Sequence, residues 1–161
     1  MLGGRKVAFE DNRNQVKQAL SRAVEAYLEE AGGELQAQTV KNSRTDFGQT
    51  KGSYQYAVDR SEGACYVGSQ LENAIWEEFG TGDYAIQGGR KTPWYVPVDG
   101  YRGTKKPTFQ GKVVVVYGKN GKAYYKTNGK KPNRPLQRAF EEKKGMLQKR
   151  LEEILSQTFG G

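Results

Sequence analysis

The spacing of apolar residues divides this chain into two helical ends and a strand-rich middle. Between residues 13 and 40 apolar side chains recur every three or four positions, as on one face of an amphipathic helix. The same spacing returns over 135–157, where Pro135 suits the first turn of a helix. Gly32-Gly33 interrupts the first pattern. Because each glycine costs roughly 1 kcal/mol in a helix relative to alanine, we expect a kink there or two helices end to end.

Two hairpins are predicted between these ends. Apolar and polar residues alternate over 53–59, and a second short strand follows over 64–67 after a glycine-containing turn. Further along, the apolar strand 113–117 and its partner 123–126 flank Asn120-Gly121, a strong signal for a two-residue hairpin turn. Both pairs of strands are local, so they predict antiparallel pairing.

A short helix and a long loop complete the predicted order. Ser69 and Glu72 have the spacing of a capping box, and Leu71, Ile75 and Phe79 form an apolar stripe before Gly80. We expect Phe79 to be a buried anchor. Residues 83–111 are rich in Gly, Pro and Lys, and prolines there exclude a long helix, which predicts an extended loop.

The fold class that follows is α+β in a single domain spanning 1–161. An antiparallel sheet of hairpins is packed by a long N-terminal helix and a C-terminal helix, with a long Gly/Pro/Lys-rich loop between them. The expected segments are an N-terminal helix (13–40), a hairpin and short helix (49–82), the loop (83–111), a second hairpin (112–127) and the C-terminal helix (135–157).

The chain has no histidine and a single cysteine, Cys65. This composition excludes a Cys/His zinc site, a Ser-His-Asp or Cys-His catalytic group and an intramolecular disulfide. The sequence therefore predicts a protein that is not an enzyme and that uses no metal and no cofactor. No window approaches the roughly 20 apolar residues of a membrane-spanning helix, so we expect no membrane partner.

The apolar content is too thin for a large core. Leu, Ile, Val and Phe make up 30 of the 161 residues, and ten Tyr and two Trp supply further amphipathic area. Tyr and Trp are also residues that protein interfaces favour. We therefore expect a folded chain that completes its burial against neighbouring subunits.

The net charge of +8 is concentrated in one stretch of the chain. The net charge is −4 over residues 1–87 and +2 over residues 132–161. Over residues 88–131 it is +10, and Asp99 is the one acidic residue there. The cations of this basic segment are candidates for docking or for facing DNA, although lysines at strand edges also serve simply to prevent aggregation. They are Arg90, Lys91, Arg102, Lys105, Lys106, Lys112, Lys119, Lys122, Lys126, Lys130 and Lys131.

Glu77 and Glu78 are adjacent carboxylates that could suggest acid-base catalysis. Neighbouring residues of a helix point in different directions, however, and carboxylates near a helix are usually solvated or ion-paired, which disfavours a catalytic pair. For Glu78 we favour capping of local backbone amides or pairing with a basic neighbour.

Three motifs in order along the chain resemble the tail-component family of tailed bacteriophages, the tail-completion or head-tail joining proteins of the neck. They are Thr45–Ser53, then Val67-Gly68-Ser69 with Ala74–Gly82, then Gly129–Phe140, and the resemblance covers residues 10–157. The most specific piece is Glu78-Phe79-Gly80-Thr81-Gly82, whereas Phe47, Thr50 and Leu136 depart from the family pattern. The residues that the family motifs carry over, all with structural roles, are Gly48, Gly68, Ser69, Glu78, Phe79, Gly80, Thr81, Gly82, Pro93, Trp94, Pro135, Leu136 and Ala139.

The resemblance implies a virion structural protein, made in the host cytoplasm and located at the head-tail junction. There it would form a ring, most naturally a hexamer, between the head connector or stopper and the tail terminator or tail tube, with genomic DNA passing through the channel. Two alternatives remain open: a tail terminator that caps the tail tube, and a nucleic-acid-binding protein that uses the basic segment 88–131.

Overall fold

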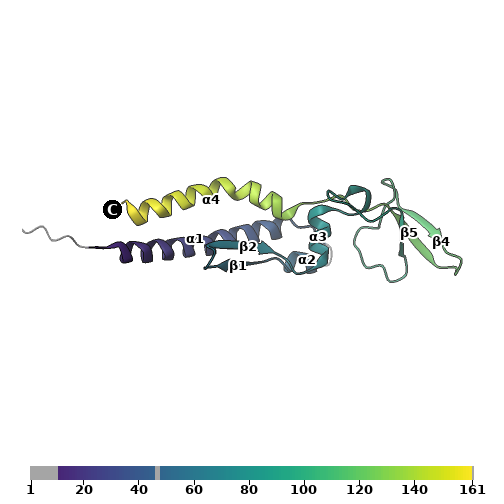
Figure 1. The fold of residues 1–161 in the computed structure, drawn as a ribbon. Helices are drawn as coiled ribbons and strands as arrows, with labels where there is room; N and C mark the ends of the chain where they lie inside the picture. The colour runs from purple at the N-terminus through teal and green to yellow at the C-terminus, as the bar shows by residue number, and fades with distance from the viewer. Residues whose placement is uncertain (1–10, 46–47, 161) are drawn as a thin grey trace, which may run out of the picture.

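Two long antiparallel helices lie side by side and form one end of the molecule (Figure 1). They are α1 (Arg13–Asn42) and α4 (Pro135–Phe159) in a computed structural model that describes residues 11–45 and 48–160. Ala31 and Leu147 are buried, and ion pairs such as Lys143 with Glu34 (2.8 Å) join the two helices across the exposed rim. Exposed ion pairs contribute little, so apolar packing supplies most of the stability of this helix pair.

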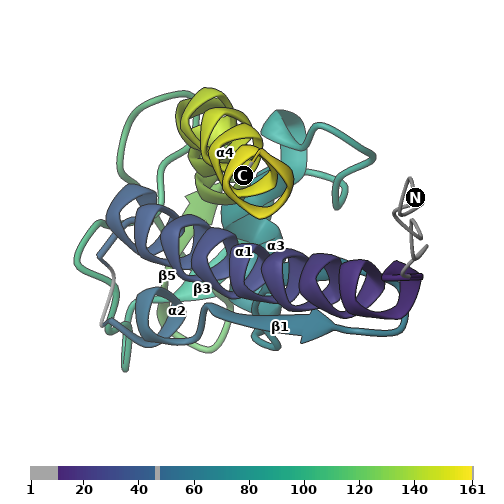
Figure 2. The same ribbon diagram turned by 90° about the vertical axis from the view of Figure 1, so that its left-hand side faces the viewer.

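The first hairpin packs on the side of α1 that faces away from α4, as Figure 2 shows. It consists of β1 (Gln55–Asp59) and β2 (Ala64–Gly68), paired antiparallel. Helix α1 runs without a break through Gly32-Gly33, so the segment is one helix and not two helices end to end. The reason is tertiary: a Cβ on Gly32 would lie 2.4 Å from Cδ2 of Tyr56, so glycine is needed for the hairpin to approach the helix.

A second sheet lies at the opposite end of the molecule, beyond the ends of α1 and α4 (Figure 1). Its strands are β3 (Trp94–Pro97), β4 (Val114–Tyr117) and β5 (Ala123–Thr127), ordered β3-β5-β4 and antiparallel throughout. The hairpin of β4 and β5 matches the one predicted from the Asn-Gly turn. β3, however, lies inside the segment predicted to be a loop, and the 3-10 turn Gly82–Tyr84 opens that segment.

Short helices connect the two ends. α2 (Gln49–Gly52) follows the motif around Gly48, and α3 (Glu72–Phe79) is the predicted short helix. The predicted capping box is absent, because Leu71 occupies the N-cap position and the Ser69 hydroxyl accepts from the Leu71 amide (3.0 Å) and pairs with Ser53. Asp46 and Phe47, in the first motif, lie outside the described residues. The predicted α+β class of long terminal helices and antiparallel strands is confirmed, with the strands in two separate sheets.

Tyr54 is the largest fully buried side chain of the described residues, with 1% of its surface exposed. Its hydroxyl lies near Ser43, Glu77 and Glu78, but no described group forms a hydrogen bond of good geometry with it. Burial, followed by the negative charge of Glu77, raises the pKa of Tyr54 to about 12. The folded protein therefore holds this side chain in its neutral form.

The stability of the folded protein is expected to fall at alkaline pH because the Tyr54 hydroxyl is buried. Above pH 10 the unfolded chain loses the Tyr54 proton while the folded chain keeps it, so stability falls as pH rises from about 10 to about 12. The full loss is about 2–3 kcal/mol. Tyr54→Phe should be as stable as the native protein at pH 7 or more stable by about 1 kcal/mol, because it removes an unpaired buried hydroxyl. Urea titrations at pH 8 and pH 11 check this; an equal loss of stability in both proteins would contradict it.

Candidate functional site

Helix α3 exposes its apolar stripe and buries two of its three glutamates. Ile75 is 58% exposed and Phe79 44%, whereas Glu77 and Glu78 are only 4% and 7% exposed. The prediction that Phe79 is a buried anchor is therefore wrong. A short helix can offer only one face to the interior, and here hydrogen bonding of the two glutamates decides which face that is.

Glu77 joins the end of α1 to the segment that leads into α4. Its carboxylate accepts hydrogen bonds from the Arg44 amide (2.6 Å), the Ser43 hydroxyl (3.1 Å) and the Asn133 side-chain amide (3.0 Å). Its backbone carbonyl also accepts from the amide of Asn133 (2.8 Å). These donors compensate the cost of burying the charge.

Glu78 caps the N-terminus of α4 from a different helix. Its two carboxylate oxygens accept from the amides of Leu136 (2.9 Å) and Gln137 (3.1 Å). The first helical amides have no partner within their own helix, and a carboxylate there also meets the positive end of the helix dipole. Glu78 thus caps backbone amides, as expected, but those of α4 rather than of its own turn.

The second and third family motifs meet at the loop after α3. The Thr81 amide donates to the Lys130 carbonyl (2.9 Å), and the Lys130 amide donates to Thr81 Oγ1 (2.9 Å). Gly82 has φ +60°, and a Cβ there would lie 2.4 Å from the Asn128 carbonyl oxygen. Gly129 has φ +115°, and a Cβ there would lie 2.0 Å from the Thr81 carbonyl oxygen. Glycine is required at both positions, because the two backbones touch.

The other residues named from the family resemblance lie at or near the ends of helices and strands. Gly48, with φ +73°, precedes α2, and Gly68 ends β2. Gly80, with φ +75°, ends α3. Pro93 precedes β3, which begins at Trp94. Pro135 starts α4, and Ala139 is buried one turn later, with 1% of its surface exposed.

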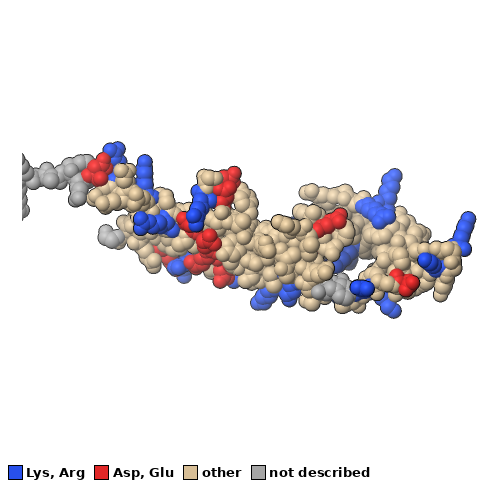
Figure 3. All heavy atoms as spheres, turned by 90° about the horizontal axis from the view of Figure 1, so that it is seen from below, with Lys and Arg blue, Asp and Glu red and all other residues tan. Residues whose placement is uncertain are grey.

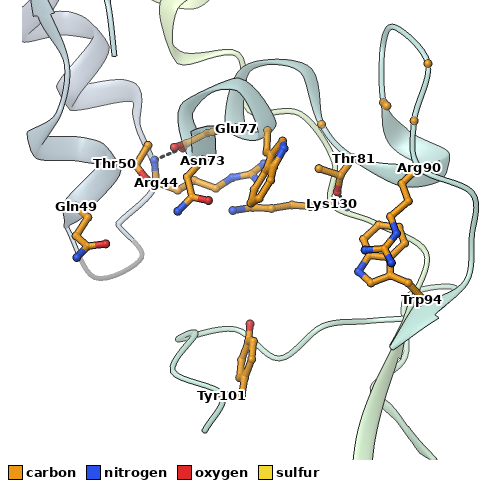
Figure 4. Close-up of a pocket in the computed structure, with 16 residues that line it drawn as sticks. Arg44, Gln49, Thr50, Asn73, Glu77, Thr81, Arg90, Trp94, Tyr101 and Lys130 are labelled. Atoms are coloured by element: carbon orange, nitrogen blue, oxygen red, sulfur yellow. Dashed lines mark hydrogen bonds between the residues drawn. The ribbon is translucent and has the colours of Figure 1, made fainter. Parts of the chain in front are cut away.

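A pocket of about 640 Å³ opens beside α3, between the two ends of the molecule (Figure 4). Its cationic lining residues are Arg44, Arg90 and Lys130, from segments far apart in the sequence. Its aromatic lining residues are Trp76, Trp94 and Tyr101. Figure 4 shows Arg90 lying across Trp94, with 5.3 Å between guanidinium carbon and ring centroid, and Tyr101 pointing toward the cavity from the loop after β3.

The only acidic side chain that lines this pocket among the described residues is Glu77, which already accepts three hydrogen bonds. Of the pocket cations, Arg44 donates to the Lys131 carbonyl (3.1 Å), and neither Arg90 nor Lys130 forms an ion pair with an acid in the described ranges. The pocket therefore carries a net positive charge beside aromatic surface.

Sequence reasoning named Arg90, Lys130 and Trp94 but missed Arg44 and Tyr101. Arg44 follows the end of α1, and Tyr101 lies in a loop, where no local pattern marks a side chain as facing a distant pocket. Trp76 stood within a family motif without a role of its own. Only the folded structure shows that these residues line one pocket.

The rest of the basic segment surrounds the second sheet. Lys91, Arg102, Lys105, Lys106 and Lys112 lie in the loops around β3 and before β4, while Lys119 and Lys122 flank the β4–β5 turn. Lys126 lies over the Phe109 ring (4.0 Å) and Lys131 over the Tyr84 ring (5.7 Å). Within the described part of the chain, no cation of segment 88–131 forms an ion pair.

The structure offers little for other chemistry. Among residues 11–45 and 48–160, no three Cys, Asp or Glu side chains gather as metal ligands. Burial, followed by the nearby charge of Glu29, raises the pKa of the Cys65 thiol, which disfavours the reactive thiolate. None of the described helices combines the length and apolarity needed to cross a membrane.

Comparison with protein-family models, with curated proteins and with solved structures finds no match for this chain. The motifs and the geometry of α3 and its pocket are therefore the basis for assigning a function.

Proposed function

We propose that this protein is a structural subunit of the neck of a tailed phage, acting in tail completion or head-tail joining. Copies of the chain form a ring, with six subunits on the family resemblance, between the head connector or stopper and the tail terminator or tail tube. The role is assembly rather than catalysis. The two buried carboxylates of α3, Glu77 and Glu78, accept hydrogen bonds from backbone and side-chain donors and so have a structural role.

The observation that carries this proposal is the exposed apolar face of α3. Leu71, Ile75 and Phe79 follow one another at helical spacing, and 38%, 58% and 44% of their surfaces are exposed. Exposed, contiguous apolar surface is typical of interaction sites. The same chain exposes large apolar side chains on its other helices, strands and loops: Val16, Leu20, Tyr66, Ile86, Tyr95, Val113, Val115, Tyr117, Phe140, Met146 and Phe159.

The extent of exposed surface also favours a chain that is completed by copies of itself. The accessible surface is 12069 Å², about half as much again as the roughly 8,000 Å² expected for a compact monomer of this mass. Exposed apolar residues occur on α1, α3 and α4 rather than in one patch. Two different patches that meet head to tail generate a ring when the rotation closes. A second copy is therefore the partner that we assign to the α3 face.

Ile75→Asp is expected to abolish assembly without unfolding the subunit. Ile75 is 58% exposed, so the monomer tolerates a charge there within about 0.5 kcal/mol, whereas an interface does not. Native mass spectrometry and light scattering measure the ring; thermal unfolding measures the fold. Gln87→Asp, which adds the same charge at an exposed loop position, is the matched control and should assemble normally. A native protein that stays monomeric, or an Ile75→Asp ring, refutes the assigned interface.

The location in the virion has its own test. Mass spectrometry of purified particles should detect the chain, and cryo-EM should place it as a ring at the head-tail junction. Density at the end of the tail tube, in tails that have not joined a head, would instead identify a tail terminator. Absence from purified virions would overturn the proposal altogether.

A further inference from the structure

Cations without acidic partners converge on the pocket beside α3. Arg44 comes from the end of α1, Arg90 from the loop before β3, and Lys130 from the segment between β5 and α4 (Figure 4). Neither Arg90 nor Lys130 has an acid within ion-pair distance among the described residues, and the one lining carboxylate is saturated by structural donors. Such a pocket attracts carboxylate or phosphate groups.

The pocket wall is aromatic as well as cationic. The chain has only two tryptophans, and both Trp76 and Trp94 line the pocket together with Tyr101. Trp, Tyr and Arg are the residues most enriched among the hot spots of protein interfaces. An apolar or aromatic side chain flanked by carboxylates would match this combination.

The pocket is also preorganised. Thr81, Gly82 and Lys130 line the pocket, and two hydrogen bonds between Thr81 and Lys130 tie the two backbone segments together. A partner therefore does not have to order these segments on binding, which lowers the entropic cost of association.

We propose that this pocket binds an acidic peptide segment of a partner protein, seated by Arg44, Arg90 and Lys130 and anchored between Trp76 and Trp94. The inference rests on the proposed function in one respect, that the occupant is a segment of another neck protein. A single-stranded nucleic acid would need a continuous basic track along its backbone. On the face that Figure 3 shows, the Lys and Arg side chains at the end opposite the two long helices project from its edges and tip and form no continuous band.

Tryptophan fluorescence reports on this pocket directly, because both tryptophans line it. The full-length protein is titrated at low salt with a peptide of about ten residues that is rich in Asp and Glu and has a central Phe. The same peptide with Asn and Gln in place of its acids, and a single-stranded oligonucleotide, serve as comparison ligands. We expect a saturable change in emission with the acidic peptide only.

Two charge-matched double variants locate the binding. Arg90→Gln with Lys130→Gln removes two pocket cations, and affinity for the acidic peptide should fall at least about tenfold, which corresponds to about 1.4 kcal/mol. Lys119→Gln with Lys122→Gln removes two cations from the β4–β5 turn, and affinity should change less than about twofold. All four lysine or arginine side chains lack ion pairs within the described ranges, so neither variant should unfold.

Each other outcome overturns the inference. Equal loss in both double variants would show diffuse electrostatic attraction instead of a pocket. Binding of the oligonucleotide without the acidic peptide would assign the pocket to nucleic acid, and no binding of either at low salt would remove it as an anion site. Ring formation is measured separately by native mass spectrometry, so failure of the peptide test and failure of the neck proposal remain distinguishable.

Discussion

Glu77→Ala is expected to destabilise the protein by about 3–5 kcal/mol. The substitution removes a buried carboxylate and leaves the Arg44 amide, the Ser43 hydroxyl and the Asn133 side chain without their acceptor. Buried donors that lose their partner carry the full cost of desolvation. The end of α1 and the start of α4 should then separate more easily. Urea unfolding followed by circular dichroism measures the loss.

Glu72→Ala is the matched control for this prediction. Glu72 is a glutamate of the same helix, but it is exposed and lies in the first turn of α3, where its charge favours the helix dipole. Its removal should cost less than about 1 kcal/mol. If Glu77→Ala were equally mild, the junction between α1, α3 and α4 would not depend on that carboxylate.

Gly32→Ala is expected to destabilise the protein by about 1–3 kcal/mol even though alanine is the better helix former. The new Cβ would lie 2.4 Å from Cδ2 of Tyr56 and 2.6 Å from Sγ of Cys65, so the hairpin of β1 and β2 must move away from α1. Thermal unfolding should show a lower midpoint than the native protein.

At the neighbouring Gly33, alanine is expected to raise the stability of the protein. A Cβ on Gly33 would have no heavy atom within 4 Å, and the residue lies in the same uninterrupted helix. Gly33→Ala should therefore stabilise the protein by about 0.5–1 kcal/mol, through helix propensity alone. If both alanine variants gained stability, the close approach of the hairpin to α1 would be disproved.

The terminal helices and the two predicted hairpins could be read from the sequence because their signals are local. Helical periodicity in the two terminal segments corresponds to α1 and α4, which extend only two residues further at their C-terminal ends. The Asn120-Gly121 turn correctly placed β4 and β5. In these elements the backbone hydrogen bonds join residues that are near neighbours in the chain, so periodicity and turn chemistry suffice to place them.

Strand β3 could not be predicted in the same way. It has four residues, ends at Pro97, and pairs with β5, whose partner residues lie about thirty positions away. Trp94, Tyr95 and Val96 are strand-forming residue types, but they lie between two prolines and no partner strand is close to them in the sequence. Its conformation is fixed by long-range pairing.

The orientation of α3 and the pocket beside it were also decided by tertiary structure. The apolar stripe of Leu71, Ile75 and Phe79 marked a helix correctly, but amphipathic spacing does not say which face is buried. Hydrogen bonds to Glu77 from the residues just after α1, and to Glu78 from the first turn of α4, hold the carboxylates inside and leave the apolar stripe outside. The sequence alone determined the helices, the hairpins and the location of the basic charge, because these depend on neighbouring residues. The inward glutamates, the glycine at the α1–hairpin contact and the convergence of Arg44, Arg90 and Lys130 depend on segments distant in sequence, which only the folded chain brings together.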